Sequence, residues 1–174
     1  MRILELKRVL GIDPGSQRTG WGVVESTGSR CQYVASGVID LRKIDGLVNK
    51  LGHLSREIET VLGHYKPTAA AIEAVFHGKN AKSALVLGQA RGAAIATLGR
   101  TSVECVELSP AEIKLSVAGH GAAGKEQVAQ MVERLLDIKL KGPSDEFDAL
   151  AVAIAGGALV ASSTREWMSK HGLG

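Results

Sequence analysis

Three strand-like segments open the chain, and the turns between them are too short for anything except antiparallel pairing. The segments run from Val9 to Asp13, from Gly20 to Ser26 and from Gln32 to Leu41, with polar and glycine residues between them. Parallel neighbours need a crossover connection of about a dozen residues or more, and none of these turns provides one. We therefore predict an antiparallel meander of three strands.

The rest of the chain alternates between helix-like and strand-like segments. Apolar residues recur with the helical period from Leu47 to Tyr65, and Pro67 marks the end of that helix. Two further strands are predicted, from Ala69 to Phe76 and from Ser102 to Leu108. Four further helices are predicted: one of small residues (Asn80 to Gly99), a short one (Pro110 to Lys114), an amphipathic one (Lys125 to Asp137) and a buried apolar one (Ser144 to Ala161). This order predicts a single α/β domain over residues 1–174, with a mixed five-stranded sheet flanked by helices. Residues 1–8 and 162–174 are expected to be loose.

Charge and apolar content narrow the class of protein. A net charge of +3 and a pI of about 9.0 suit binding to nucleic acid. Cys31 and Cys105 form no CxxC pair, which disfavours a zinc site, and we expect both to be buried thiols in a reducing cytoplasm. Charges interrupt the first eight residues, and the apolar run from Ala149 to Ala161 falls short of the roughly 20 residues of a membrane span. We expect a cytoplasmic protein with no membrane partner.

Four acidic residues lie where an isolated charge is costly. Asp13 ends the first strand, Glu73 interrupts an apolar strand, and Asp145 and Asp148 share one face at the start of the last helix. No Lys or Arg stands next to them in the sequence, and burying an unpaired carboxylate costs several kcal/mol. Divalent cations would offset this cost. Four carboxylates can hold two Mg²⁺ ions roughly 4 Å apart, an arrangement that activates water and clamps a phosphodiester.

Each acid also has a purely structural interpretation. Asp13 is a good turn residue, Glu73 can pair with a distant arginine, and Asp145 suits the first turn of any helix. The four acids together favour a metal site, because their segments can converge at one end of a sheet. The glycines around Asp13, with Pro14 and Gly15 in the turn, are interpreted as leaving room for a phosphate.

Two lysines and one phenylalanine lie near these acids. Lys125 follows the loop GHGAAGK, which lacks P-loop spacing, and it can steady a phosphate or be an ordinary solvated lysine. Lys114 lies just upstream of that loop. Phe76, three residues after Glu73, can stack on an unpaired base or close the core at a strand end.

These motifs resemble those of the RuvC-type Holliday junction resolvases, in the family's order from about Val9 to Ala161. The resemblance is carried by four stretches: GIDPGSQRTGWGVV, AIEAVFHGKNAKSALVLGQARG, GHGAAGKEQV and SDEFDALAVAIA. The second stretch is the most specific. The resemblance implies an RNase H-like fold and a homodimer that resolves four-way junctions by symmetric, Mg²⁺-dependent nicks, with Mn²⁺ as a plausible substitute. It also implies a branch-migration helicase motor of the RuvA and RuvB type as partner.

The resemblance assigns roles to individual residues. It implies that Asp13, Glu73, Asp145 and Asp148 are the catalytic and metal-binding acids, although some members carry His in place of Asp145. It implies that Lys114 and Lys125 are the important lysines, with Lys125 supporting the scissile phosphate, and that Phe76 stacks on a base. A stripe of small residues in the second predicted helix suits either packing on the sheet or contact between two subunits: Ala81, Ala84, Gly88, Gly92 and Ala96.

Two other functions compete with a junction-resolving nuclease. Actin-like ATPases and sugar kinases also open with Asp-x-Gly and a glycine-rich hairpin, but the chain is short for two such domains and shows no second phosphate-binding hairpin. A junction-binding module without chemistry is the other alternative. The four acids disfavour it, because bare carboxylates repel phosphates unless a metal bridges them.

Overall fold

The protein folds into a mixed five-stranded sheet in the order β3-β2-β1-β4-β5. The computed structural model describes residues 6–27, 30–74 and 81–170, and from residue 162 onwards the backbone alone. The strands are β1 (Lys7–Asp13), β2 (Arg18–Ser26), β3 (Cys31–Asp40), β4 (Ala69–Glu73) and β5 (Glu104–Leu108). The first three strands are antiparallel, and β4 and β5 run parallel to β1, which confirms the predicted mixed sheet.

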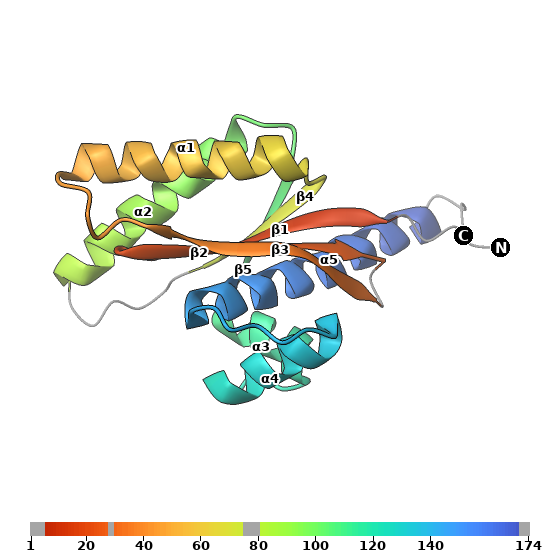
Figure 1. Ribbon diagram of the computed structural model, residues 1–174. Helices are drawn as coiled ribbons and strands as arrows, with labels where there is room; N and C mark the ends of the chain where they lie inside the picture. Colours follow the sequence, from red (N-terminus) through yellow and green to blue (C-terminus); the bar gives the residue numbers. More distant parts are fainter. Residues whose placement is uncertain (1–5, 28–29, 75–80, 171–174) are drawn as a thin grey trace.

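Helices cover both faces of the sheet (Figure 1). They are α1 (Leu47–Tyr65), α2 (Ala81–Gly99), α3 (Pro110–Ala118), α4 (Lys125–Leu136) and α5 (Ser144–Lys170). Helices α1 and α2 lie on one face, and α3, α4 and α5 lie on the other. Strand side chains alternate between two cores, so Leu10 and Ile12 pack toward α1 and α2 while Val9 packs toward α5.

Helix α5 lies unusually close to β1 and β2, because glycine occupies the facing strand positions. A Cβ atom on Gly11 would lie 2.3 Å from both the Ala149 carbonyl oxygen and the Ala153 nitrogen. One on Gly20 would lie 2.0 Å from the carbonyl oxygen of Asp145. These distances are too short for any side chain. The glycines therefore let the helix backbone pack directly on the strand backbones.

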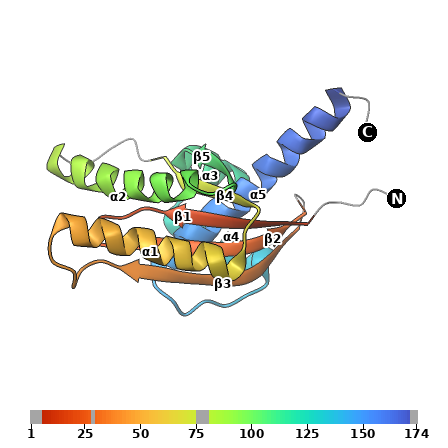
Figure 2. The same ribbon diagram turned by 90° about the horizontal axis from the view of Figure 1, so that it is seen from above.

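Two helices end later in the structure than predicted. Helix α3 begins as predicted at Pro110, after a capping box between Ser109 and Glu112, but it continues past Lys114 to a left-handed cap at Gly119. Helix α5 continues to Lys170, well past the expected loose tail from residue 162 (Figure 2). No glycine or proline interrupts either extension.

The first strand begins two residues earlier than predicted, at Lys7. Lys7 and Arg8 belong to β1, and the Arg8 guanidinium bonds the Glu25 carboxylate and, at 2.7 Å, the carbonyl oxygen of Tyr65. Residues 1–5 and 171–174 lie outside the described part of the chain.

The two cysteines are less buried than predicted. Cys105 is exposed and Cys31 is half-buried, because β5 and β3 are the two edge strands of the sheet. Among the described residues, none of the helices is both long enough and apolar enough to cross a membrane.

Gly11→Ala is expected to destabilise the protein by about 1–3 kcal/mol or more, since the new methyl group would overpack the contact with α5. The free energy of unfolding in urea measures this effect. Gly63→Ala is the matched control, because its Cβ would meet no atom within 4 Å, and it should stabilise α1 by a few tenths to about 1 kcal/mol. Equal stability of the two variants would contradict the close packing of α5.

Candidate active site

Asp13 and Glu73 end two neighbouring parallel strands. Ile12 pairs with Ile72, and each acid lies one residue further along its strand. Since side chains alternate, both acids point to the face that α5 covers, as Gly11 does. Their carboxyl groups are joined by a hydrogen bond. Strand register alone therefore brings together two acids that are 60 positions apart in the sequence.

The first turn of α5 places Asp145 and Asp148 beside these strand ends. Gly20 lies directly under the backbone of Asp145, so the turn rests on β2. Both side chains remain about a quarter exposed, at 27% and 28%. A pocket of about 300 Å³ opens between α5, α3 and α4 beside the strand ends, and its lining holds three of the acids and both predicted lysines: Asp13, Glu73, Pro110, Ile113, Lys114, Lys125, Val128, Asp148, Ala151 and Val152. Asp145 lies outside this lining.

The acids act on one another electrostatically. The pKa of Asp13 is raised to about 9, most of all by burial and next by the hydrogen bond with Glu73. The negative charges of Glu73, Asp148 and Asp145 also contribute to this rise. A pKa raised this far, by burial first and by neighbouring carboxylates second, indicates that a negative charge at the strand ends is unfavourable without a positive partner.

Two basic side chains contact the outer acids, which sequence reasoning did not foresee. Lys125 Nζ donates a hydrogen bond to Asp148 Oδ2 at 2.6 Å, and this contact raises the pKa of Lys125. Arg18 Nη1 lies 3.8 Å from Asp145 Oδ2. Lys125 was singled out as a candidate from the loop before it, whereas Arg18 was missed. Its only signal was its place at the start of the second strand, across the turn from Asp13.

The interpretation of the glycines as room for a phosphate is wrong for the glycines that lie within the strands. Gly11, Gly20 and Gly22 face the backbone or side chains of α5, which fills the space beside them. Gly15 serves the turn itself, because a Cβ there would lie 1.9 Å from the carbonyl oxygen of Arg18. The glycines thus determine where α5, and with it Asp145, is placed.

The donor chemistry of the cluster fits a hard divalent cation. Carboxylate oxygens are the ligands that Mg²⁺ prefers, and positive side chains already neutralise the outer two acids. Within the described ranges, no three His, Cys, Asp or Glu side chains are yet close enough to hold an ion as they stand. Cation binding would therefore draw the carboxylates together and compete with Lys125 for Asp148.

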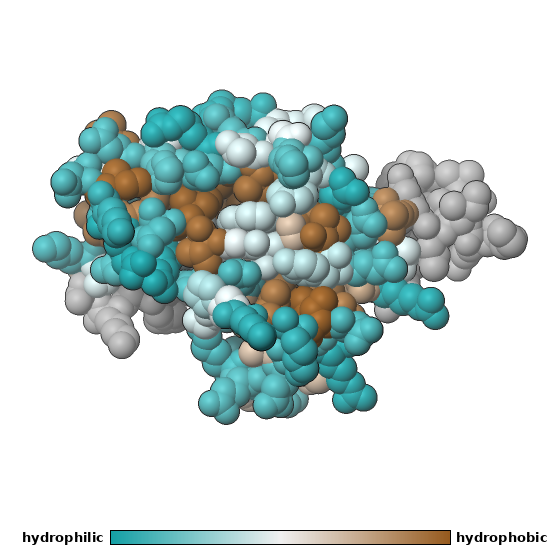
Figure 3. Space-filling view, in the orientation of Figure 1, coloured by the Kyte–Doolittle hydropathy of each residue, from teal (hydrophilic) through white to brown (hydrophobic). Residues whose placement is uncertain are grey.

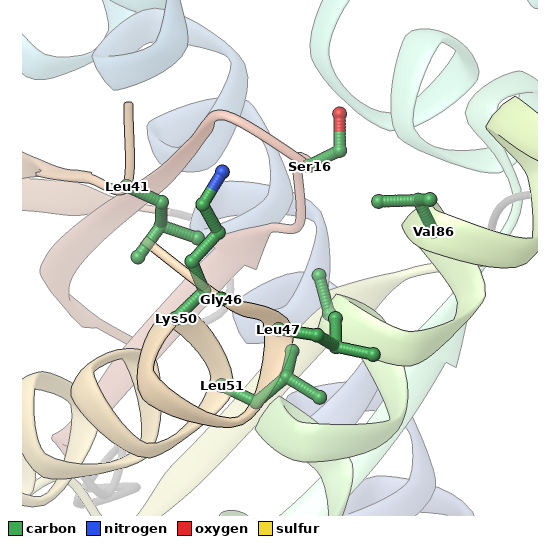
Figure 4. Close-up of a pocket in the computed structure, with 8 residues that line it drawn as sticks. Ser16, Leu41, Gly46, Leu47, Lys50, Leu51 and Val86 are labelled. Atoms are coloured by element: carbon green, nitrogen blue, oxygen red, sulfur yellow. The ribbon is translucent and has the colours of Figure 1, made fainter. Parts of the chain in front are cut away.

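A second pocket, of about 180 Å³, lies beside the turn that follows β1 (Figure 4). Its walls are mostly aliphatic side chains of α1, α2 and the end of β3, and the Ser16 hydroxyl and Lys50 ammonium lie toward one side of it. It contains no carboxylate. The face of the molecule in Figure 3 is mainly hydrophilic, with separate hydrophobic patches. This second pocket therefore lacks the carboxylate ligands that line the pocket beside the strand ends.

Phe76, the predicted base-stacking residue, lies outside the described residues. Lys114 lies in the wall of the larger pocket, as its prediction requires. Among the described residues, no arginine pairs with the Glu73 carboxylate, although Arg91 bonds its backbone carbonyl oxygen.

Comparison with known proteins identifies the family. The model of "Crossover junction endodeoxyribonuclease RuvC" matches residues 9–156, which is most of the chain. The chain belongs to the RuvC family. It is 46% identical to the RuvC of Hyphomonas neptunium over 84% of this chain and 88% of that protein. It is 45% identical to the RuvC of Pseudomonas syringae pv. syringae over 95% of this chain and 92% of that protein.

A solved structure agrees with this assignment. Thermus thermophilus RuvC in complex with Holliday junction substrate superposes with a TM-score of 0.84 at 30% identity, over 91% of this chain and 97% of that one. The sheet order, with its antiparallel meander and two added parallel strands, is the RNase H-like fold of this family. The predicted fold class is confirmed.

Asp13→Asn is expected to stabilise the protein in EDTA at alkaline pH. The pKa of Asp13 is about 9 in the fold and near 3.8 in an unfolded chain, so between these values the folded state binds more protons. Wild-type stability therefore falls as the pH rises through this window, and asparagine removes that slope. Urea unfolding should give the variant a gain of about 1–3 kcal/mol near pH 8 and a smaller gain near pH 5.

The exposed Asp45→Asn is the matched control, since it makes the same substitution outside the cluster and should change stability little. A pH slope in Asp13→Asn equal to that of the wild type would contradict the shared negative charge of the cluster.

Proposed function

We propose that this chain is an endonuclease that resolves four-way DNA junctions by symmetric paired nicks, in homologous recombination and DNA repair in the cytoplasm. The observation that carries the proposal is the convergence of two strand-end acids and two helix acids beside one pocket, whose lining also holds two lysines. Membership of the RuvC family supports it, as does the superposition on a RuvC bound to Holliday junction substrate.

The proposed chemistry is hydrolysis of a phosphodiester. Two divalent cations, Mg²⁺ or Mn²⁺, held by Asp13, Glu73, Asp145 and Asp148 would supply activation of water and stabilisation of the leaving 3′-oxygen, giving 5′-phosphate and 3′-hydroxyl ends. Lys125, released from Asp148, would then bind the negative scissile phosphate.

Two further residues would contribute to binding of the junction. Lys114 would contact the DNA backbone from the wall of the same pocket, and Phe76 would stack on a base near the crossover. Such contacts make affinity depend on salt, and they select for the shape of the junction more than for its sequence.

A second copy of the chain is the proposed partner at α2. The five small residues singled out above are all exposed, and a Cβ on Gly88 or Gly92 would meet no atom within 4 Å. They therefore do not pack on the protein's own sheet, and Leu85 beside them is 63% exposed. Two such helix faces can approach closely, and a two-fold dimer would present two active sites to the two-fold junction. A branch-migration motor of the RuvA and RuvB type is the further proposed partner.

Asp148→Asn is expected to lower the rate of junction cleavage by about 100-fold or more, because it removes several kcal/mol of cation-mediated stabilisation. A labelled four-way junction with Mg²⁺, compared with linear duplex, measures the rate and the position of the nicks. An intact junction after incubation with wild-type protein under binding conditions would contradict the proposed function. ATP hydrolysis without junction cleavage would favour a kinase-like alternative, and junction binding without cleavage would favour a binding module.

Gly92→Arg is expected to convert the dimer to a monomer, since a long charged side chain would separate the two α2 helices. Light scattering coupled to size exclusion gives the mass directly. Gly63→Arg is the matched control, because Gly63 is an equally open, exposed helix glycine on α1, and it should stay dimeric. A wild-type monomer, or a dimeric Gly92→Arg variant, would contradict the α2 interface.

A further inference from the structure

Arg91 of α2 bonds both of the strands that end beside the candidate active site. Its Nε donates a hydrogen bond to the backbone carbonyl oxygen of Glu73 at 3.2 Å, and its Nη2 forms an ion pair with the Glu107 carboxylate. The Arg91 side chain is only 22% exposed. One guanidinium thus connects the last residue of β4 to the next-to-last residue of β5.

Sheet pairing is weakest at the point where Arg91 binds. Residues from Ala69 to Ile72 pair with β1 on one side and with β5 on the other. Glu73 pairs with Leu108 of β5, and its register with β1 has already ended. The next residue, Ala74, donates a hydrogen bond to Leu108 at 2.8 Å. Arg91 therefore adds a contact where the ladder holds Glu73 from one side only.

Arg91 reaches Glu73 without blocking its carboxylate. Helix α2 covers the face of the sheet shared with α1, whereas the Glu73 carboxyl group bonds Asp13 and lines the pocket on the α5 face. Because Arg91 binds the backbone oxygen, the carboxylate stays available to the pocket. The contact fixes the peptide group next to the Cα atom from which the Glu73 side chain projects.

We propose that Arg91 is a positioning residue, which orients the Glu73 carboxylate toward the acid cluster by holding the end of β4 against β5. This inference rests on the proposed function, because it assigns Arg91 to the same site. Arginine suits the task, since its planar fork presents two donors to two acceptors at once. Lysine keeps the charge but offers a single ammonium group, so it cannot hold both partners in the same geometry.

The expected effect is large, although Arg91 does not touch the substrate. A displacement of about 1 Å in a reacting group can cost about 100-fold in rate. We therefore expect Arg91→Lys and Arg91→Gln each to lower the single-turnover rate at saturating protein by about 100-fold, with junction affinity in Ca²⁺ little changed. Glu107→Gln should have a smaller effect, because its amide oxygen still accepts a hydrogen bond from Arg91.

A second readout does not depend on cleavage. The rise in Tm on adding Mn²⁺ reports cation binding by the cluster, and it should be smaller in both Arg91 variants than in the wild type. Arg100→Gln is the matched control. Arg100 also bridges two partners, Ser55 and Glu59, but these lie on α1 away from the acids. The control should keep the wild-type rate and the wild-type response to Mn²⁺.

The outcomes are distinguishable. A wild-type rate in Arg91→Lys would overturn the inference, and so would a loss of junction affinity that accounts for the lower rate. If Arg100→Gln lost as much rate as the Arg91 variants, the effect would be general destabilisation, and this result would also overturn the inference. If the wild-type protein cleaves no junction, the proposed function fails. The response to Mn²⁺ then still decides the role of Arg91 in placing Glu73.

Discussion

The close contact between α5 and the glycines of β1 and β2 is the constraint on which the site depends. Side chains at Gly11 and Gly20 would push the helix away from the sheet, and the first turn of α5 would then carry its acids away from the strand ends. With glycine at both positions, the backbone at Asp145 rests on β2, close enough for Asp145 and Asp148 to act on Asp13. Packing of small residues thus determines the electrostatics of the pocket.

The four acids, gathered in one place, make an unfavourable contribution to the free energy of folding. Burial and mutual repulsion keep Asp13 protonated, and two basic side chains offset the outer charges. Lys125 is 65% exposed and Arg18 is 36% exposed, so solvent screens both ion pairs and either side chain can leave its partner. The contacts that neutralise the cluster are therefore weak enough to be exchanged for those of a cation or a phosphate.

Local patterns in the sequence were sufficient to predict the strand-end acids but not the groups that contact them. Asp13 and Glu73 each follow a continuous apolar run, so their place at the end of a buried strand could be inferred from neighbouring residues. The role of Arg91 depends on how α2 is seated against β5, which no local pattern encodes. A glycine in a strand indicates that another group lies close to it but does not identify that group, so the glycines around Asp13 were interpreted as room for a phosphate, whereas the neighbour of Gly11 is α5.

The packing of α5 on the sheet also limits the positions at which residues can be inserted or deleted. Its contacts with the sheet recur from Asp145 to Gly157, so the rotation of the helix about its axis is fixed over several turns. One residue inserted or deleted in that stretch would turn the two acids by about 100° relative to the contacts that follow. Beyond residue 161 the helix runs on past the sheet (Figure 2), and extra or missing residues there leave the pocket unchanged. Related sequences should therefore vary in length after this point and keep a constant length before it.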